Sequence, residues 1–115
     1  MKDVSLIIYS VADMTGAKRF FRELIGADPY VDGAPYVGYK SGEIEIGLVP
    51  TGGKREPTTI PYWTVDDIAA TVKALEGAGG TVVQQITDVG YGLLVASIRD
   101  SNGATVGLRQ MPTGA

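Results

Sequence analysis

The chain has 115 residues, of which 44% are hydrophobic and 20% charged, and it contains neither cysteine nor histidine. This length suits one ordinary domain, and the balance of apolar and charged residues excludes a disordered chain. The net charge of −3, with basic residues scattered along the chain, argues against nucleic acid as a partner.

The two missing residue types exclude several kinds of site. Without cysteine the chain can form no disulfide, thiolate metal site or cysteine nucleophile. Without histidine it lacks the commonest metal ligand and the usual general base near neutral pH. No apolar run approaches the length of about 18 residues that a membrane helix needs, and no secretory signal is recognised. We therefore expect a cytoplasmic protein that does not bind membranes.

The first half of the chain predicts a strand, a helix and three shorter strands. Residues 4–9 are rich in valine and isoleucine, which indicates a buried strand. Asp13 can cap a helix that ends at Gly26, with Ala17, Phe20, Phe21 and Leu24 on its buried stripe. Turn signals after that helix separate strands expected near residues 29–31, 35–40 and 43–49.

The second half predicts the same series of elements. Residues 51–58 are rich in proline and glycine and indicate a linker. A strand over residues 60–65 leads to a helix capped by Asp66, which stops at Gly79-Gly80. Further strands are expected over residues 81–86, 91–98 and 104–109, the last two joined through Asn102-Gly103.

The two halves therefore form an internal repeat. A shift of 54 residues places Val11, Asp13, Phe21 and Gly26 on Val65, Asp67, Leu75 and Gly80. We predict a single α+β domain over residues 1–115, with βαβββ modules at 1–50 and 59–110 and a linker at 51–58. Paired modules would form a curved, largely antiparallel eight-stranded sheet with a cleft on its helix-free side.

Several short motifs resemble one known superfamily. They are the Val-x-Asp steps Val11-Ala12-Asp13 and Val65-Asp66-Asp67, the pair Phe20-Phe21 before Leu24-Ile25-Gly26, and Asp100-Ser101-Asn102-Gly103. Together they resemble the vicinal-oxygen-chelate superfamily, which contains glyoxalase I, the bleomycin-resistance proteins and the extradiol dioxygenases. The resemblance covers residues 4–109 and implies paired βαβββ modules and, often, a homodimer.

The resemblance also implies four metal-ligand positions. Enzymes of the superfamily place histidines or carboxylates on the first and last strand of each module, and the matching positions here are Leu6, Gly47, Ile60 and Gly107. None of these residues has a side-chain oxygen or nitrogen, which a divalent cation needs. We therefore expect no metal, no other cofactor and no metal-dependent glyoxalase or dioxygenase activity.

Alternation of side chains along the strands predicts which residues line the cleft. Trp63 and Val65 should face the core. The residues expected on the open face, and so to bind a ligand, are Leu6, Ile8, Glu45, Gly47, Ile60, Tyr62, Gly107 and Arg109.

Each of these residues also has an ordinary structural interpretation. Gly47 and Gly107 either let a flat ligand approach the backbone or relieve crowding in a curved sheet. Tyr62 either stacks on a ligand or packs within the sheet. Glu45 and Arg109 either anchor a polar ligand or are solvated surface charges.

The sequence favours a metal-free, homodimeric binding protein for an apolar or aromatic small molecule, for which an antibiotic or natural product is a reasonable candidate. No catalytic residue is assigned. The alternative is a metal-independent lyase or isomerase that uses Glu45 or Tyr62 for proton transfer. A structural or regulatory module without a ligand is a third possibility.

Overall fold

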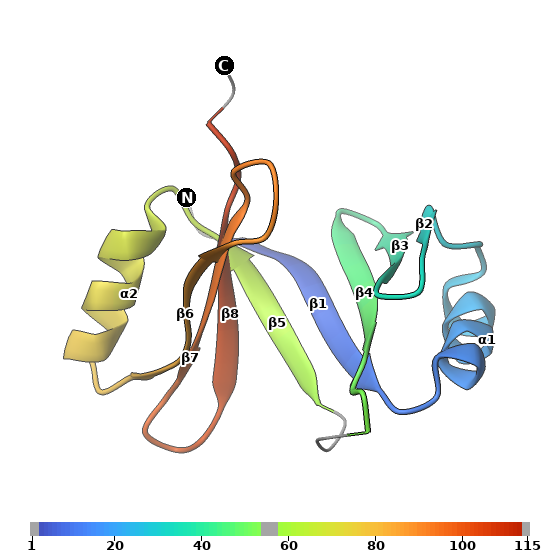
Figure 1. Cartoon of the computed structure of the whole chain (residues 1–115), viewed down its shortest axis with the longest axis horizontal. Coiled ribbons are helices and arrows are strands. Elements are labelled where there is room, and N and C mark those ends of the chain that lie inside the picture. The colour runs from blue at the N-terminus through green and yellow to red at the C-terminus, as the bar shows by residue number, and fades with distance from the viewer. Residues whose placement is uncertain (1–2, 54–57, 114–115) are drawn as a thin grey trace. The chain divides into compact units, whose positions relative to one another are not determined.

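The computed structural model describes residues 3–53 and 58–113, and within them the chain forms two helices and eight strands (Figure 1). The chain divides into two compact units, Ser5–Ile60 and Pro61–Ala115, the latter together with Met1–Val4. We call them the first and the second unit. Residues 54–57 of the predicted linker lie outside the described residues.

The first unit contains one helix and four strands. Its elements are β1 (Asp3–Val11), α1 (Met14–Ile25), β2 (Val31–Asp32), β3 (Val37–Ser41) and β4 (Ile44–Pro50). The strands lie in the order β2-β3-β4-β1, with β1 parallel to β4 and the other pairs antiparallel.

The second unit repeats this arrangement with β5 (Thr59–Thr64), α2 (Ile68–Gly77), β6 (Thr81–Asp88), β7 (Leu94–Arg99) and β8 (Thr105–Gln110). Its strand order is β5-β8-β7-β6, with β5 parallel to β8. The predicted α+β fold with two βαβββ modules is therefore confirmed. Over the described residues, neither helix is long and apolar enough to cross a membrane.

Aspartate side chains cap both helices. Asp13 accepts a hydrogen bond of 3.1 Å from the Gly16 N–H at the start of α1. A Cβ atom at Gly16 would lie 2.6 Å from a carboxylate oxygen of Asp13, so a side chain there would require this carboxylate to shift. The cap of α2 is Asp67, which accepts from the Ala70 N–H at 3.0 Å, and not Asp66 as predicted. Asp67 is the residue that the internal repeat aligns with Asp13.

The core of the first unit lies between α1 and the strands β3 and β4. Its buried side chains are Phe21, Val37, Tyr39 and Leu48. The ring of Tyr9 on β1 packs against Phe21 with centroids 4.8 Å apart, so Tyr9 is on the helix side of its strand. Burial raises the pKa of the Tyr39 phenol above its ordinary value, and the hydroxyl donates to the Lys18 carbonyl oxygen at 3.1 Å.

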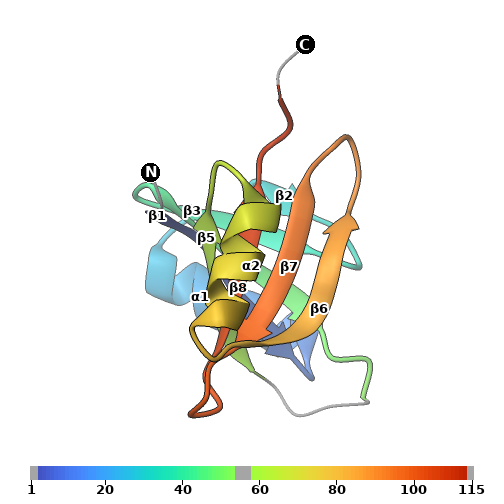
Figure 2. The same cartoon turned by 90° about the vertical axis from the view of Figure 1, so that its left-hand side faces the viewer.

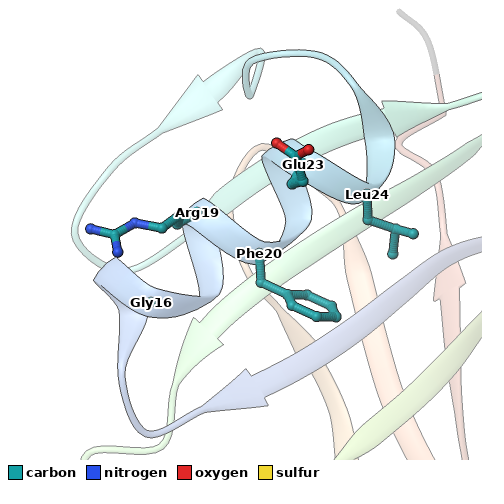
Figure 3. A pocket seen from close by; sticks show the side chains of 5 residues that line it. All are labelled: Gly16, Arg19, Phe20, Glu23 and Leu24. Atoms are coloured by element: carbon teal, nitrogen blue, oxygen red, sulfur yellow. The ribbon is translucent and has the colours of Figure 1, made fainter.

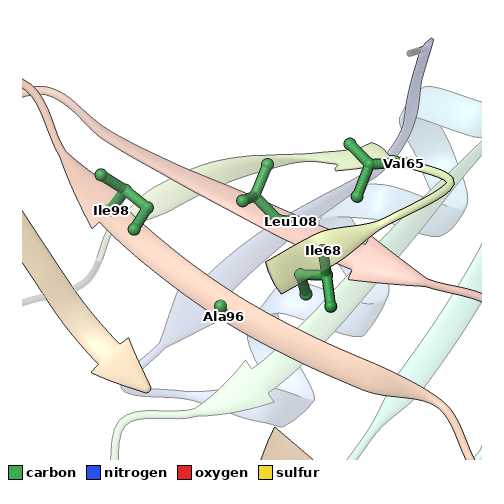
Figure 4. Close-up of a cluster of buried hydrophobic side chains, with 5 residues drawn as sticks. All are labelled: Val65, Ile68, Ala96, Ile98 and Leu108. Carbon is green, nitrogen blue, oxygen red and sulfur yellow. The ribbon is translucent and has the colours of Figure 1, made fainter. Parts of the chain in front are cut away.

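The core of the second unit lies beneath α2, which packs on β6, β7 and β8 (Figure 2). Figure 4 shows its five buried side chains, Val65, Ile68, Ala96, Ile98 and Leu108. The prediction that Trp63 belongs to this core is wrong, because 37% of its surface is exposed. Trp63 lies on β5, beside the strands on which α2 packs.

The predicted strand over residues 91–98 begins only at Leu94. Gly90, Tyr91 and Gly92 have φ angles of 129°, 55° and 82° and form a turn. These left-handed conformations are incompatible with an extended strand. The sequence predicted a strand there and missed the turn because position 91 holds an aromatic residue.

Candidate functional site

Four of the predicted ligand-binding residues lie together on the helix-free face of the first unit. On β1, Leu6 pairs with Glu45 of β4 and Ile8 pairs with Gly47. Tyr9 faces the helix, so its neighbour Ile8 faces the opposite way. Leu6 is only 8% exposed and contributes little to the surface of this face.

An aromatic ring covers Gly47. A Cβ atom there would lie 2.6 Å from Tyr36 Cε1 and Oη and 2.7 Å from Ile8 Cδ1. The same ring passes over Gly38 on β3, where a Cβ atom would lie 2.9 Å from Tyr36 Cε2. Gly38 pairs with Gly47 across the two strands. The two glycines therefore let the ring of Tyr36 lie directly on the backbone of the sheet.

Tyr36 is part of a polar and aromatic cluster that the sequence did not predict. Its hydroxyl donates a hydrogen bond to Glu45 Oε2. Lys40 Nζ lies 3.9 Å from Glu45 Oε1 and 4.5 Å from the centroid of the Tyr30 ring. The Glu45 side chain is 15% exposed and that of Lys40 is 65% exposed. We refer to Tyr30, Tyr36, Lys40 and Glu45 as the Glu45 cluster.

The helix-free face of the second unit brings together the other three predicted residues on β5 and β8. Tyr62 pairs with Gly107, and a Cβ atom at Gly107 would lie 2.6 Å from Tyr62 Cγ. Arg109 Nε donates to Thr64 Oγ1 at 3.2 Å, and these two residues are also paired in register. The Tyr62 ring therefore covers Gly107 in the same way that the side chains of Ile8 and Tyr36 cover Gly47.

Ile60, the eighth predicted residue, is half-buried on β5. Near it in the chain, Thr58 binds the side chain of Ser10 on β1. The hydroxyl groups of the two residues lie 2.9 Å apart, and the Thr58 N–H donates to Ser10 Oγ at 2.8 Å. Ser10 is 4% exposed, so these bonds satisfy a buried hydroxyl.

A second surface feature lies on the outer side of α1. An open hollow of about 680 Å³ is lined by Gly16, Arg19, Phe20, Glu23 and Leu24 (Figure 3). Phe20 and Leu24 are 63% and 68% exposed, which corrects the prediction that both belong to the buried stripe. Successive helical residues are about 100° apart, so a helix that turns Phe21 into the core turns Phe20 away from it.

The arrangement of paired βαβββ modules defines a class of protein, and a family comparison identifies it. Residues 4–108 match the model of the Glyoxalase/Bleomycin resistance protein/Dioxygenase superfamily, and the chain belongs to this superfamily. No curated protein gives a significant match to the chain.

Solved structures share the fold at low sequence identity. The hypothetical protein BH1468 from Bacillus halodurans C-125 superposes with a TM-score of 0.78 at 13% identity, covering 99% of this chain and 97% of that one. Methylmalonyl-CoA epimerase from Mycobacterium tuberculosis gives 0.67 at 17% identity, covering 96% and 87%. A superfamily member from Vibrio splendidus 12B01 gives 0.70 at 12% identity, covering 91% and 95%.

The close fit of Tyr62 on Gly107 leads to a stability prediction. Gly107→Ala should lower the free energy of unfolding by about 1–3 kcal/mol, because the new methyl group overlaps the root of the tyrosine ring. Urea denaturation measures this change. In a Tyr62→Ala background the same substitution should cost much less, since the overlapping ring is gone.

Gly77→Ala is the matched control, because nothing lies within 4 Å of a Cβ atom at that helical position. It should leave stability unchanged or raise it by up to about 1 kcal/mol. Equal costs of Gly107→Ala with and without the Tyr62 ring would contradict the proposed contact.

Proposed function

We propose that this protein binds a small apolar or aromatic molecule on the helix-free faces of its two units and does so without a metal. The observation that carries the proposal is the stacking of tyrosine rings on bare backbone, Tyr36 over Gly47 and Tyr62 over Gly107. Both rings are partly exposed. Flat aromatic surfaces beside a few polar groups are typical of small-molecule sites.

The residues at the four metal-ligand positions support a metal-free site. Leu6 and Ile60 carry hydrocarbon side chains, and Gly47 and Gly107 carry none. The space above each glycine is taken by neighbouring side chains. A divalent cation requires oxygen, nitrogen or thiolate ligands, so these residues do not fit one.

Polar anchors accompany the aromatic surface on each unit. On the first unit, Glu45 is held by Tyr36 beside the apolar Leu6 and Ile8. On the second unit, Arg109 is held by Thr64, paired with it on the neighbouring strand. A charged group that is already oriented costs less conformational entropy when it binds a ligand. Membership of a superfamily that includes bleomycin-resistance proteins makes an antibiotic or other natural product the ligand that we propose.

A metal-independent lyase or isomerase is the second candidate, and one observation favours it. Glu45 is a mostly buried carboxylate with a tyrosine hydroxyl bonded to it, which is a possible acid and base pair. Structures described as methylmalonyl-CoA epimerases are among those that share the fold.

Binding of 2-naphthol tests the proposed function. In ¹⁵N-¹H correlation spectra, the probe should shift the amide signals of Gly38 and Gly47, which lie beneath the Tyr36 ring, and leave Gly42 unchanged. Tyr36→Leu should weaken binding about two- to tenfold, as expected for the loss of one aromatic contact. Phe20→Leu, which removes an exposed ring on α1, should have no effect.

Two results would count against this function. Probe-induced shifts confined to α1, or none at all, would remove the proposed face as the binding site. Incorporation of solvent deuterium into methylmalonyl-CoA by the parent protein, lost in Glu45→Gln, would establish the enzyme instead.

We also propose that two copies of the chain pair through the outer side of α1. Gly16, Phe20 and Leu24 lie four residues apart and so form one ridge of the helix. A two-fold axis at Phe20 would place Leu24 of each copy over Gly16 of the other, beside the Asp13 carboxylate that caps the helix. Figure 3 shows Phe20 and Leu24 projecting from one side of α1, with the charged groups of Arg19 and Glu23 directed away from them.

The charges of this surface are complementary to themselves. With the axis at Phe20, Arg19 of one copy lies about 3 Å along the helix from Glu23 of the other, given a rise of 1.5 Å per residue. A helix pair buries less than the roughly 1,600 Å² of a standard stable interface. We therefore expect a weak homodimer that dissociates on dilution.

Sedimentation velocity over a range of concentrations tests the pairing. Arg19→Glu should shift the equilibrium toward monomer, because it places like charges together. The double variant Arg19→Glu/Glu23→Arg restores opposite charges and should recover the dimer. Val89→Glu, at a 55% exposed position in the second unit, is the control and should change nothing. Equal association of the single and double variants would refute this interface.

A further inference from the structure

The Glu45 cluster holds a positive charge against an aromatic ring. Lys40 Nζ lies 4.5 Å from the centroid of the Tyr30 ring and 3.9 Å from Glu45 Oε1. Lys40 and Glu45 are directly opposite each other on β3 and β4. A ring face and a carboxylate are two groups that attract an organic cation, the ring through its quadrupole and the carboxylate through its charge.

Gly38 brings these groups together. A Cβ atom at Gly38 would lie 2.9 Å from Tyr36 Cε2, 3.1 Å from Tyr30 Cε1 and 3.2 Å from Glu45 Oε2. Two aromatic rings and a carboxylate therefore converge on one point of backbone that has no side chain. The Tyr36 hydroxyl also donates to Glu45, which holds the carboxylate in place.

Lys40 is weakly held in this position. Its side chain is 65% exposed, and an ion pair of 3.9 Å at the surface contributes little to stability. The long lysine side chain can return its ammonium group to water at small cost. A ligand cation could therefore replace it.

The geometry points to a subsite for an organic ammonium group, formed by Tyr30, Tyr36 and Glu45, that Lys40 occupies in the free protein. This inference rests on the proposed small-molecule function and specifies the ligand class, an apolar or aromatic body that carries an amine or quaternary ammonium group. Lys40 acts as an internal competitor for that group, so its removal strengthens cation binding.

Two probes of the same shape, one cationic and one neutral, isolate the effect of the charge. They are (4-hydroxyphenyl)trimethylammonium and the neutral 4-tert-butylphenol, each titrated while the Gly38 and Gly47 amide signals are followed. Lys40→Met should raise the affinity for the ammonium probe about three- to fivefold and leave the neutral probe unchanged. In that background, Tyr30→Leu and Glu45→Gln should each lower the ammonium affinity by a similar factor.

Lys18→Met is the matched control, because it removes the same charge from the first unit at a lysine paired with Asp32 at 2.9 Å. Equal effects of Lys18→Met and Lys40→Met on the ammonium probe would overturn the subsite. Binding of both probes at the two glycines without any influence of charge would overturn the subsite and leave the proposed function standing. If neither probe shifts these amides, both proposals fail.

Discussion

The packing of aromatic rings on bare backbone is the contact on which the helix-free faces depend. Tyr36 lies over Gly47 and Gly38, and Tyr62 lies over Gly107. Any side chain at these glycines would overlap a ring, so the glycines and tyrosines depend on each other. Gly47 and Gly107 are two of the positions at which the superfamily resemblance implies metal ligands, and the rings fill the space that ligand side chains would need. The open faces thus present aromatic surface and isolated polar groups.

The strands place the core and the proposed binding surface on opposite faces. On β4, Leu48 is fully buried against α1, whereas its neighbour Gly47 faces the other way beneath a tyrosine ring. On β8, Leu108 packs in the core beneath α2, and its neighbour Gly107 lies beneath Tyr62. Because side chains alternate along a strand, each glycine lies on the open face while the adjacent leucine packs against the helix.

The sequence predicted the fold because its signals were local and occurred twice. The cap at Asp13, the stop at Gly26 and the alternation of the strands all agree with the structure. The Tyr36 ring and the Tyr30–Lys40 contact were missed, because the sequence predicted strands over residues 29–31 and 35–40, whereas the structure places Tyr30 and Tyr36 in connecting segments. Periodicity also failed on α1 and at Trp63, since an apolar residue at a helical or strand spacing can belong to an exposed surface as well as to a core.

Ring-current shifts of the glycine Hα protons test the stacking of the tyrosines most directly. If the rings lie on the backbone, the Hα signals of Gly47 and Gly107 should move upfield of that of Gly42, which has no neighbour within 4 Å of a Cβ atom. Tyr36→Leu should abolish the shift at Gly47 but not at Gly107, and Tyr62→Leu the shift at Gly107 but not at Gly47. Ordinary Hα shifts at both glycines in the parent protein would contradict the account.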